Sequence, residues 1–392
     1  MDTRAGQYMP TVSGYRTFIP APLPPTPPLA LDTELLQCLS DADRALGRLD
    51  GVTSVLPNPD LFVAMYVRQE AVLSSQIEGT QSTLEDVLQF ELDGDTEALP
   101  KDVEEVVNYV RAMNAGLQRL DDLPLSLRLI RELHAILLQN VRGSLRTPGE
   151  FRTSQNWIGT AGCTLQTATF VPPDVAGMHQ ALNNFETFLH DRTLPALIHC
   201  GLAHAQFETI HPFMDGNGRV GRLLITLLLC ERRVLHQPLL YLSHYLKAHR
   251  TEYYEHLMAI RHHGDWEGWL KFFLRGVAEV SRSATNTARA ILNLREDHRQ
   301  RMGTTVNGQR LLDYLFLHPL LSVRMVEQHL QCTFATASKL VEHGVSLGLL
   351  REVTGKQRNR RYRYEPYLAL FEPSLYQPRR DADDRIEPQP DA

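Results

Sequence analysis

The chain has 392 residues, 43% of them hydrophobic and 22% charged, which is enough for two or three domains with a sizeable core. Its longest apolar run is far shorter than the roughly 20 residues of a membrane-spanning helix. The formal net charge of -6 gives no general attraction to nucleic acid, so such binding would need a local basic patch.

The N-terminus lacks a basic stretch followed by an apolar one, so we expect a cytoplasmic protein. The cysteines are scattered and without CxxC spacing, which argues against a disulfide framework or a zinc site. We expect reduced thiols at all of them: Cys38, Cys163, Cys200, Cys230 and Cys332.

Residues 1–30 are rich in proline, which removes amide donors and favours extended backbone over helix. We expect a proline-rich arm that packs across the surface of its own protein, with a ligand for a proline-reading domain as the alternative. From Asp32 onward, leucines three and four positions apart predict helices, which we place in residues 31–100.

The helix predicted over residues 60–79 has an apolar stripe and ends at Gly79, and Ser82 with Glu85 has the spacing of a capping box that starts the next helix. Glu78 is therefore in the last turn, where the helix dipole disfavours a carboxylate by about 0.3–1 kcal/mol. A nearby cation would remove this penalty. A solvated glutamate is the alternative interpretation.

Two further amphipathic helices between residues 100 and 142 are expected to be scaffold, with His134 as a hydrogen-bonded core histidine. From Gly149 to Pro173 the chain becomes rich in threonine, β-branched and aromatic residues, which predicts two short strands. From the residues alone this could be a surface hairpin without a function. Helices at 174–190 and 195–210 follow, and His199 and His204 are five residues apart on the second, so they point away from each other and cannot chelate a metal together.

Residues 211–222 bring a histidine, a carboxylate, small turn-forming residues and two arginines together immediately before an apolar helix. A small-residue turn that opens onto a helix N-terminus presents amide groups to an anion. Arg219 and Arg222 share one face of that helix and can hold phosphate oxygens. His211 is a candidate base and Asp215 a candidate magnesium ligand.

This stretch, His-Pro-Phe-Met-Asp-Gly-Asn-Gly-Arg-Val-Gly-Arg, resembles the signature of the Fic family at every position. The resemblance extends over most of residues 10–280. It implies a mainly helical Fic bundle with a short β-hairpin flap, a catalytic core in residues 101–280, and transfer of AMP from ATP to a Ser, Thr or Tyr hydroxyl of a target protein.

The resemblance also assigns roles. His211 would accept the proton of the target hydroxyl, and Asp215 would hold Mg²⁺ on the α- and β-phosphates. Arg219 would stabilise charge on the β-phosphate and Arg222 would hold the γ-phosphate. The remaining implied ATP contacts are Gly216, Asn217, Gly218 and, by a family Tyr-Tyr pair near the adenine, Tyr253 and Tyr254. Arg261 occupies the place of a downstream asparagine in that family pattern.

Two other segments acquire a role by the same resemblance. Ser74-x-x-x-Glu78-Gly79 is similar to the inhibitory motif of the family, whose glutamate pairs with the second arginine of the signature, here Arg222. The resemblance thus implies self-inhibition, which would leave the enzyme with this sequence largely inactive. The strands after Gly149 take the place of the flap that holds the target segment by strand addition, with Thr169, Phe170 and Val171 over the active site.

Beyond a helical connector at 281–302, residues 303–371 have the succession of helices and strands of a winged helix-turn-helix domain, and 372–392 resemble a disordered tail. The turn and last strand of this domain are basic, which suits phosphate contacts: Lys356, Arg358, Arg360, Arg361 and Arg363. Its recognition helix offers Lys339 alone, balanced by Glu342. Protein docking or homodimer formation is therefore an alternative to DNA binding.

Three functional alternatives stay open. The first is that Glu78 also orients water for removal of AMP from a modified target, since a carboxylate beside a phosphoester can act as a base. The second is transfer of a nucleotidyl or phosphoryl group from another donor. The third is a chiefly regulatory role in which residues 303–370 bind DNA.

Overall fold

The computed structural model describes residues 2–54, 60–94, 99–141, 143–144, 146–160 and 162–371. The expected tail at 372–392 lies outside these residues. In the described part, no helix is both long and apolar enough to cross a membrane.

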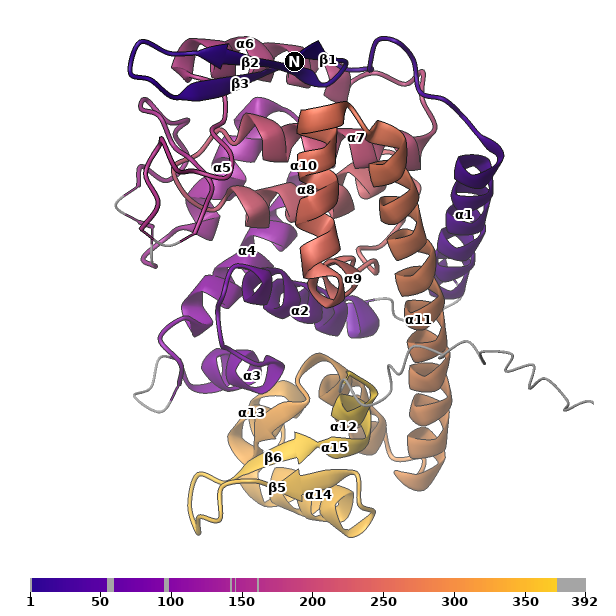
Figure 1. Ribbon diagram of the computed structural model, residues 1–392. Helices are drawn as coiled ribbons and strands as arrows, with labels where there is room; N and C mark the ends of the chain where they lie inside the picture. The colour runs from indigo at the N-terminus through magenta and orange to yellow at the C-terminus, as the bar shows by residue number, and fades with distance from the viewer. Residues whose placement is uncertain are drawn as a thin grey trace, which may run out of the picture.

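The structure is mainly helical, as the sequence predicts (Figure 1). The helices before the motif are α1 Thr33–Ser54, α2 Asp60–Ile77, α3 Leu84–Asp93, α4 Val103–Arg119, α5 Leu127–Leu137, α6 Val175–Leu189 and α7 Ala196–Ile210. The later helices are α8 Asn217–Glu231, α9 Ser243–Ala248, α10 Arg250–His263, α11 Trp266–Arg301, α12 Val306–Leu317, α13 Val323–Leu330, α14 Phe334–Ser346 and α15 Glu365–Leu368, followed by a short 3-10 turn, η1 Ala369–Phe371.

The N-terminal stretch is not simply an extended arm. It forms an antiparallel sheet of β1 Asp2–Thr3, β2 Gly6–Pro10 and β3 Arg16–Pro20, in the order β1-β2-β3. Phe18 on β3 is fully buried beside Tyr8 of β2, and the proline-dense stretch begins only where β3 ends. The high proline content led to the prediction of an extended arm, although the tyrosine, threonine and phenylalanine before the prolines favour strands. This sheet lies across the top of the helices in Figure 1.

Helices α7 and α8 form the centre of the core. Every residue of α7 from Leu197 to Ile210 is buried, and so is most of α8 from Val220 to Leu229. An all-round apolar helix must be covered on every side, and Figure 1 shows α4, α5, α6, α10 and α11 around this pair. The loop that joins α7 to α8 is residues 211–216, so two almost fully buried helices position the motif.

Helix α11 runs from the core into the C-terminal domain as one element of 36 residues, about 54 Å at 1.5 Å per residue. The connector expected at 281–302 is therefore the second half of this helix. Helix α1 packs along it (Figure 1).

The C-terminal domain has the winged helix-turn-helix order. Its strands β4 Leu320–Ser322, β5 Leu350–Glu352 and β6 Arg361–Tyr364 form an antiparallel sheet in the order β4-β6-β5. Helices α12, α13 and α14 pack against this sheet around Leu321, Val341 and Tyr364. Helices α2 and α3 lie between this domain and the helices around α8 (Figure 1).

Helix α2 ends at Ile77, and Gly79 follows with φ 97°, the left-handed conformation that glycine tolerates best. The capping box of α3 lies one residue later than the sequence suggests. Thr83 is the N-cap and Asp86 completes the box, whereas Ser82 bonds to Asp102. Both Ser82 and Thr83 have hydroxyls that can cap a helix, so tertiary contacts decided which one does.

Candidate active site

His211 caps the C-terminus of α7 in the left-handed conformation, at φ 48° and ψ 60°. A residue other than glycine costs about 1–3 kcal/mol in such a conformation and persists only where its surroundings hold it. Here Arg152 Nε and Asn156 Nδ2 both donate to the His211 carbonyl, each at 3.1 Å. These two buried side chains, which the sequence did not single out, fix the turn that aims the imidazole.

Asn217 closes the same loop from the other side. Its Oδ1 accepts from the Phe213 amide and its Nδ2 donates to the Phe213 carbonyl, both at 2.8 Å. The side chain is 3% exposed. The structure thus gives Asn217 a role in shaping the loop.

His134 is the core histidine expected from the sequence, and it also holds the motif. Its ring stacks on Phe213 at 3.7 Å between centroids. The Gly149 amide donates to Nδ1 at 2.9 Å, so Nε2 carries the proton and donates to the Asp215 carbonyl at 3.0 Å. Burial lowers the pKa of His134 to about 4, which keeps this tautomer neutral. It is a positioning residue.

The N-terminus of α8 is built to receive an anion. Gly216 is its N-cap, with φ 76° and no side-chain acceptor for the amides of the first turn. Arg219 is 1% exposed, and its Nη1 donates to Glu105 Oε2 at 3.0 Å. Asp215 lies at the rim with its side chain 37% exposed, 3.7 Å from Arg219. Nothing in the pattern around Glu105 indicated this role, since it is a buried acid on a helix expected to be scaffold.

Arg222 is paired with the end of α2, as the resemblance implies. Its Nη2 donates to Glu78 Oε1 at 2.7 Å and to the Ser74 carbonyl at 3.0 Å, and its Nε donates to Ser74 Oγ at 2.9 Å. Burial acts to raise the pKa of Glu78, but the charge and hydrogen bond of Arg222 outweigh burial and hold this pKa below its ordinary value.

Glu78 also covers the first turn of α8. A Cβ added to Gly218 would clash with Glu78 Oε1 and would lie 2.9 Å from Arg222 Nη1. The carboxylate therefore lies against the backbone that would otherwise face an anion. Gly218 makes this close approach feasible.

The His211 side chain lies in a largely buried site among both acidic and basic residues. Its Nδ1 is 3.9 Å from Glu208 Oε2, one helical turn earlier. Burial, together with the charges of Arg261 and Arg152, lowers the pKa of His211 to about 3, so the imidazole is neutral. Burial raises the pKa of Glu208 to about 7. The sequence prediction did not include Glu208, although it is the one carboxylate on the apolar helix that delivers His211.

Arg261 is buried and lies between the site and the flap. Its Nη2 donates to the Glu208 carbonyl at 3.0 Å, and its guanidinium lies 3.8 Å from the centre of the Phe170 ring. A cation over an aromatic face is stabilised by the ring quadrupole. Arg261 is thus a structural contact between α10, α7 and the flap.

The two tyrosines differ in their surroundings. Tyr253 is 1% exposed, and its hydroxyl bonds to His204 Nε2 at 2.9 Å, while His204 Nδ1 donates to the Gly221 carbonyl. It therefore lies behind the site and supports α8. Tyr254 is 37% exposed and lies under the Arg250 guanidinium, so it is the one with a surface to offer a ligand.

The flap is reduced to one antiparallel bridge, Ile158 with Phe170, closed by two backbone hydrogen bonds of 2.8 and 3.0 Å. Phe170 and Val171 are buried and Thr169 is exposed. The Phe18 amide of β3 donates to the Val171 carbonyl at 3.0 Å. The N-terminal sheet thus already covers part of the flap edge.

The described residues hold no group of three or more His, Cys, Asp or Glu that could bind a metal by themselves. Asp215 is a single exposed carboxylate whose Oδ1 accepts from the Gly216 amide at 2.6 Å. One carboxylate plus substrate phosphates is an arrangement that Mg²⁺ commonly uses. The donor set fits Mg²⁺ that arrives with a nucleotide.

Comparisons with known proteins match the segments that contain these residues. Family models described as "Fic/DOC family N-terminal", "Fic/DOC family" and "HTH DNA binding domain" match residues 36–118, 124–229 and 309–363. Two similar proteins are named protein adenylyltransferase Fic. The one from Aedes aegypti is 30% identical over 175 residues, and the one from Drosophila melanogaster is 31% identical over 167 residues.

These two alignments cover 44% and 42% of this chain and 30% of each relative, so the chain spans under a third of the length of these relatives. The crystal structure of a Fic family protein from Desulfovibrio desulfuricans G20 superposes with a TM-score of 0.56 at 19% identity, over 86% of this chain and 97% of that one. This likeness shows a shared fold. The matched segments, the fold and the intact motif around His211 together show that the chain carries Fic/DOC family domains over residues 36–118 and 124–229, followed by a helix-turn-helix domain.

Proposed function

We propose that the protein transfers AMP from ATP to a Ser, Thr or Tyr hydroxyl of a protein, and that Glu78 holds this activity back. The observation that carries the proposal is the position of the Glu78 carboxylate, on Arg222 and against Gly218, at the anion-binding end of α8. The names of the relatives support the same reaction.

In the reaction, the target hydroxyl oxygen attacks the α-phosphorus of ATP, the bond to the bridging oxygen breaks, and pyrophosphate leaves. His211 takes the hydroxyl proton on Nε2, because its Nδ1 faces Glu208. The neutral imidazole is ready to accept that proton without first losing one. The fixed turn that carries His211 and the first turn of α8 would bring the general base and the phosphate together, which lowers the entropic cost of the attack.

The phosphates would lie on the first-turn amides of α8, such as that of Gly218, with Arg219 fixed beside them by Glu105. Asp215 would hold Mg²⁺ together with the phosphates, and the ion would supply charge neutralisation there. We propose that Tyr254 contacts the adenine of ATP and that Thr169 is the flap residue exposed to a target strand. Comparing ATP with CTP, GTP and UTP as donors would test which nucleobase the site accepts.

Self-inhibition follows from competition for Arg222. With its guanidinium occupied by Glu78 and Ser74, this arginine cannot also hold the γ-phosphate, so ATP would bind in an unproductive position. The same carboxylate would lie near a bound phosphoester, so removal of AMP from a modified target is a second direction of the chemistry that we propose.

The test is incorporation of label from ATP labelled at the α-phosphate, into the enzyme itself or into proteins of a lysate. Glu78→Gly should raise incorporation well above that of the wild-type chain, and Glu78→Gly with His211→Ala should abolish it. Equal labelling by these two variants would refute the assignment of His211 as the base. Mass spectrometry of the labelled proteins would identify the target.

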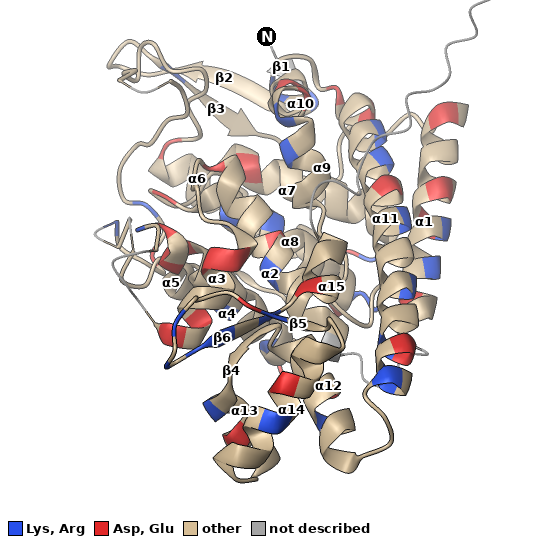
Figure 2. Ribbon diagram, turned by 90° about the horizontal axis from the view of Figure 1, so that it is seen from below, with Lys and Arg blue, Asp and Glu red and all other residues tan. Residues whose placement is uncertain are grey.

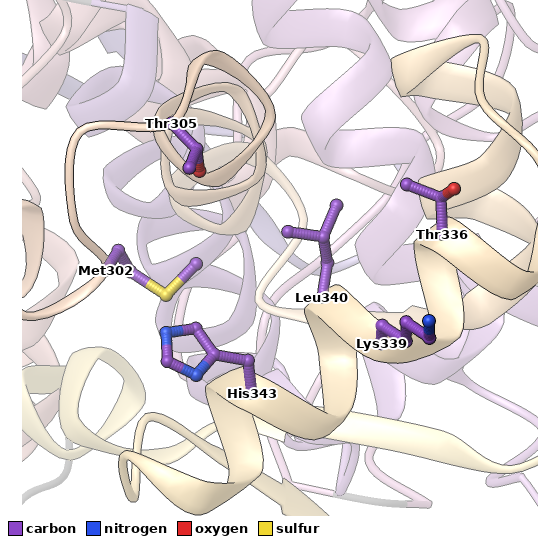
Figure 3. Close-up of a pocket in the computed structure, with 6 residues that line it drawn as sticks. All are labelled: Met302, Thr305, Thr336, Lys339, Leu340 and His343. Carbon is purple, nitrogen blue, oxygen red and sulfur yellow. The ribbon is translucent and has the colours of Figure 1, made fainter.

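A second function, binding of duplex DNA, is proposed for residues 303–371 because the matched domain is described as DNA binding. Lys356, Arg358 and Arg360 are exposed on the turn between β5 and β6. On the recognition helix α14, Lys339 and His343 border a pocket of about 320 Å³ formed with Met302 and Thr305 (Figure 3). Salt-dependent binding of a DNA duplex to the full chain would support this function, and dimer formation measured by light scattering would support the protein-docking alternative.

A further inference from the structure

The last strand of the winged domain is ion-paired to the helix that follows the inhibitory segment. Arg361 Nη2 on β6 lies 2.5 Å from Asp93 Oδ2, and Arg363 Nη1 lies 3.0 Å from Glu85 Oε2. Both acids belong to α3, one at each end. Figure 2 shows the red segments of α3 beside the blue strand β6.

These two arginines continue the row of exposed cations on the wing turn, Lys356, Arg358 and Arg360. A row of cations along a turn and strand is the pattern that contacts the phosphate backbone of a duplex. Two of its five cations are already neutralised by carboxylates of α3. The acids of α3 therefore lie where two phosphates of a bound duplex would lie.

Helix α3 is also fastened to α2. Arg68 in the middle of α2 pairs with Glu91 on α3 at 2.8 Å. Gln76 near the end of α2, two residues before Glu78, donates to the Ser82 carbonyl at 3.0 Å, immediately before the N-cap of α3. A displacement of α3 would thus pull on the last turn of α2, which carries Ser74 and leads directly into Glu78.

We propose that duplex nucleic acid and helix α3 compete for Arg361 and Arg363, so that nucleic acid bound at the wing loosens the hold of Glu78 on Arg222. This rests on both proposed functions, the DNA-binding one for the partner and the self-inhibited transferase for the consequence. The two sites are coupled through one movable element, α3, which the wing holds in the inhibited arrangement.

The competition is tested by removing the acids that occupy the wing. The full-length double variant Glu85→Gln and Asp93→Asn is compared with Asp121→Asn and Asp122→Asn, which removes the same charge from exposed positions on the turn after α4. We expect the first variant to bind a random-sequence DNA duplex about three- to tenfold more tightly than the second, with a steeper dependence on salt. Equal affinities, or no binding by either variant, would overturn the proposal.

The coupling to Glu78 is tested by amide hydrogen exchange of the wild-type chain with and without saturating duplex. We expect faster exchange in residues 74–94 when the duplex is bound, because the turn and α3 lose contacts. Unchanged exchange there, with the duplex bound, would overturn the coupling. Neither measurement requires AMP transfer. If the Glu78→Gly variant fails to label any protein, the transferase proposal is refuted, while the DNA affinities and the exchange rates still decide the competition and the coupling.

Discussion

Arg222 Nη2 donates to Glu78 Oε1 across 2.7 Å, and the two residues are separated by 144 positions in the sequence. The arginine comes from the second turn of α8 and the glutamate from the turn after α2. Since Arg222 lies on a packed helix and Glu78 directly follows another, the contact is part of the folded core. The proposed inhibition by Glu78 should therefore respond to changes at the residues that hold this pair.

Ser74→Ala should relax inhibition in part. The substitution removes the hydroxyl that accepts from Arg222 Nε at 2.9 Å, while the bonds to the Ser74 carbonyl and Glu78 remain. An unsatisfied buried donor costs about 1–3 kcal/mol, so the free energy of unfolding should fall by that amount. Labelling from α-labelled ATP should lie between those of the wild-type chain and Glu78→Gly.

The neighbouring Ser75→Ala is the matched control for this prediction. Ser75 is equally buried on the same helix turn, but its hydroxyl makes no hydrogen bond within the described residues. If Ser75→Ala raises labelling as much as Ser74→Ala does, the effect comes from loosened packing of α2 and the role given to Ser74 is wrong.

Gly218→Ala should be more destabilising while Glu78 is present. The added methyl group would clash with Glu78 Oε1, which we expect to cost about 1–3 kcal/mol as other overpacking does. In a Glu78→Gly background the same substitution should cost less, because only the 2.9 Å approach to Arg222 Nη1 remains and alanine is the better helix former. Urea unfolding of the four proteins gives the coupling energy, and additive effects would show that Glu78 does not lie over Gly218 in solution.

Glu105→Gln should destabilise the protein and weaken nucleotide binding together. Removing one partner of a buried ion pair typically costs about 3–5 kcal/mol, and Arg219 would lose the charge that holds it beside the phosphates. The adjacent Glu104→Gln changes the same charge on a half-buried side chain and should be close to neutral. Binding of a non-hydrolysable ATP analogue, measured by calorimetry in a Glu78→Gly background, should weaken only for the Glu105 variant.

Glu208→Gln should change how stability depends on pH. Burial raises the pKa of Glu208 from 4.5 to about 7 in the folded protein, so the folded state binds an additional proton between these values and loses stability as pH rises. Glu208→Gln lacks this decrease in stability with rising pH. Its free energy of unfolding relative to that of the wild-type chain should therefore increase by roughly 2–4 kcal/mol from pH 5 to pH 8.

Urea unfolding at several pH values measures this difference, and the exposed Glu255→Gln is its control. Glu70, whose pKa burial also raises to about 7, contributes in the same direction to both proteins and cancels in the comparison. The neutral buried histidines, with their pKa lowered by burial, contribute in the opposite direction and likewise cancel. A parallel pair of stability curves would contradict a protonated, buried Glu208.

The sequence by itself determined the local chemistry. The order of residues from His211 to Arg222 is contiguous, so the turn, the helix start and the spacing of the two arginines follow from local backbone preferences. The end of α2 just before Gly79 and the helix-turn-helix order of residues 306–346 are likewise local, because capping residues and helical periodicity act over a few positions.

The tertiary structure decided which distant groups meet. Glu105, Arg152 and Asn156 support the motif from segments that looked like scaffold or surface, and nothing in their local sequence indicates a partner. The sequence pattern assigns Tyr253 and Tyr254 the same role near the adenine. Only the packing of α10 on α7 shows that Tyr253 is the buried one. A local pattern specifies the face that a helix buries, whereas the identity of a charged partner depends on how whole elements pack, which no short segment encodes.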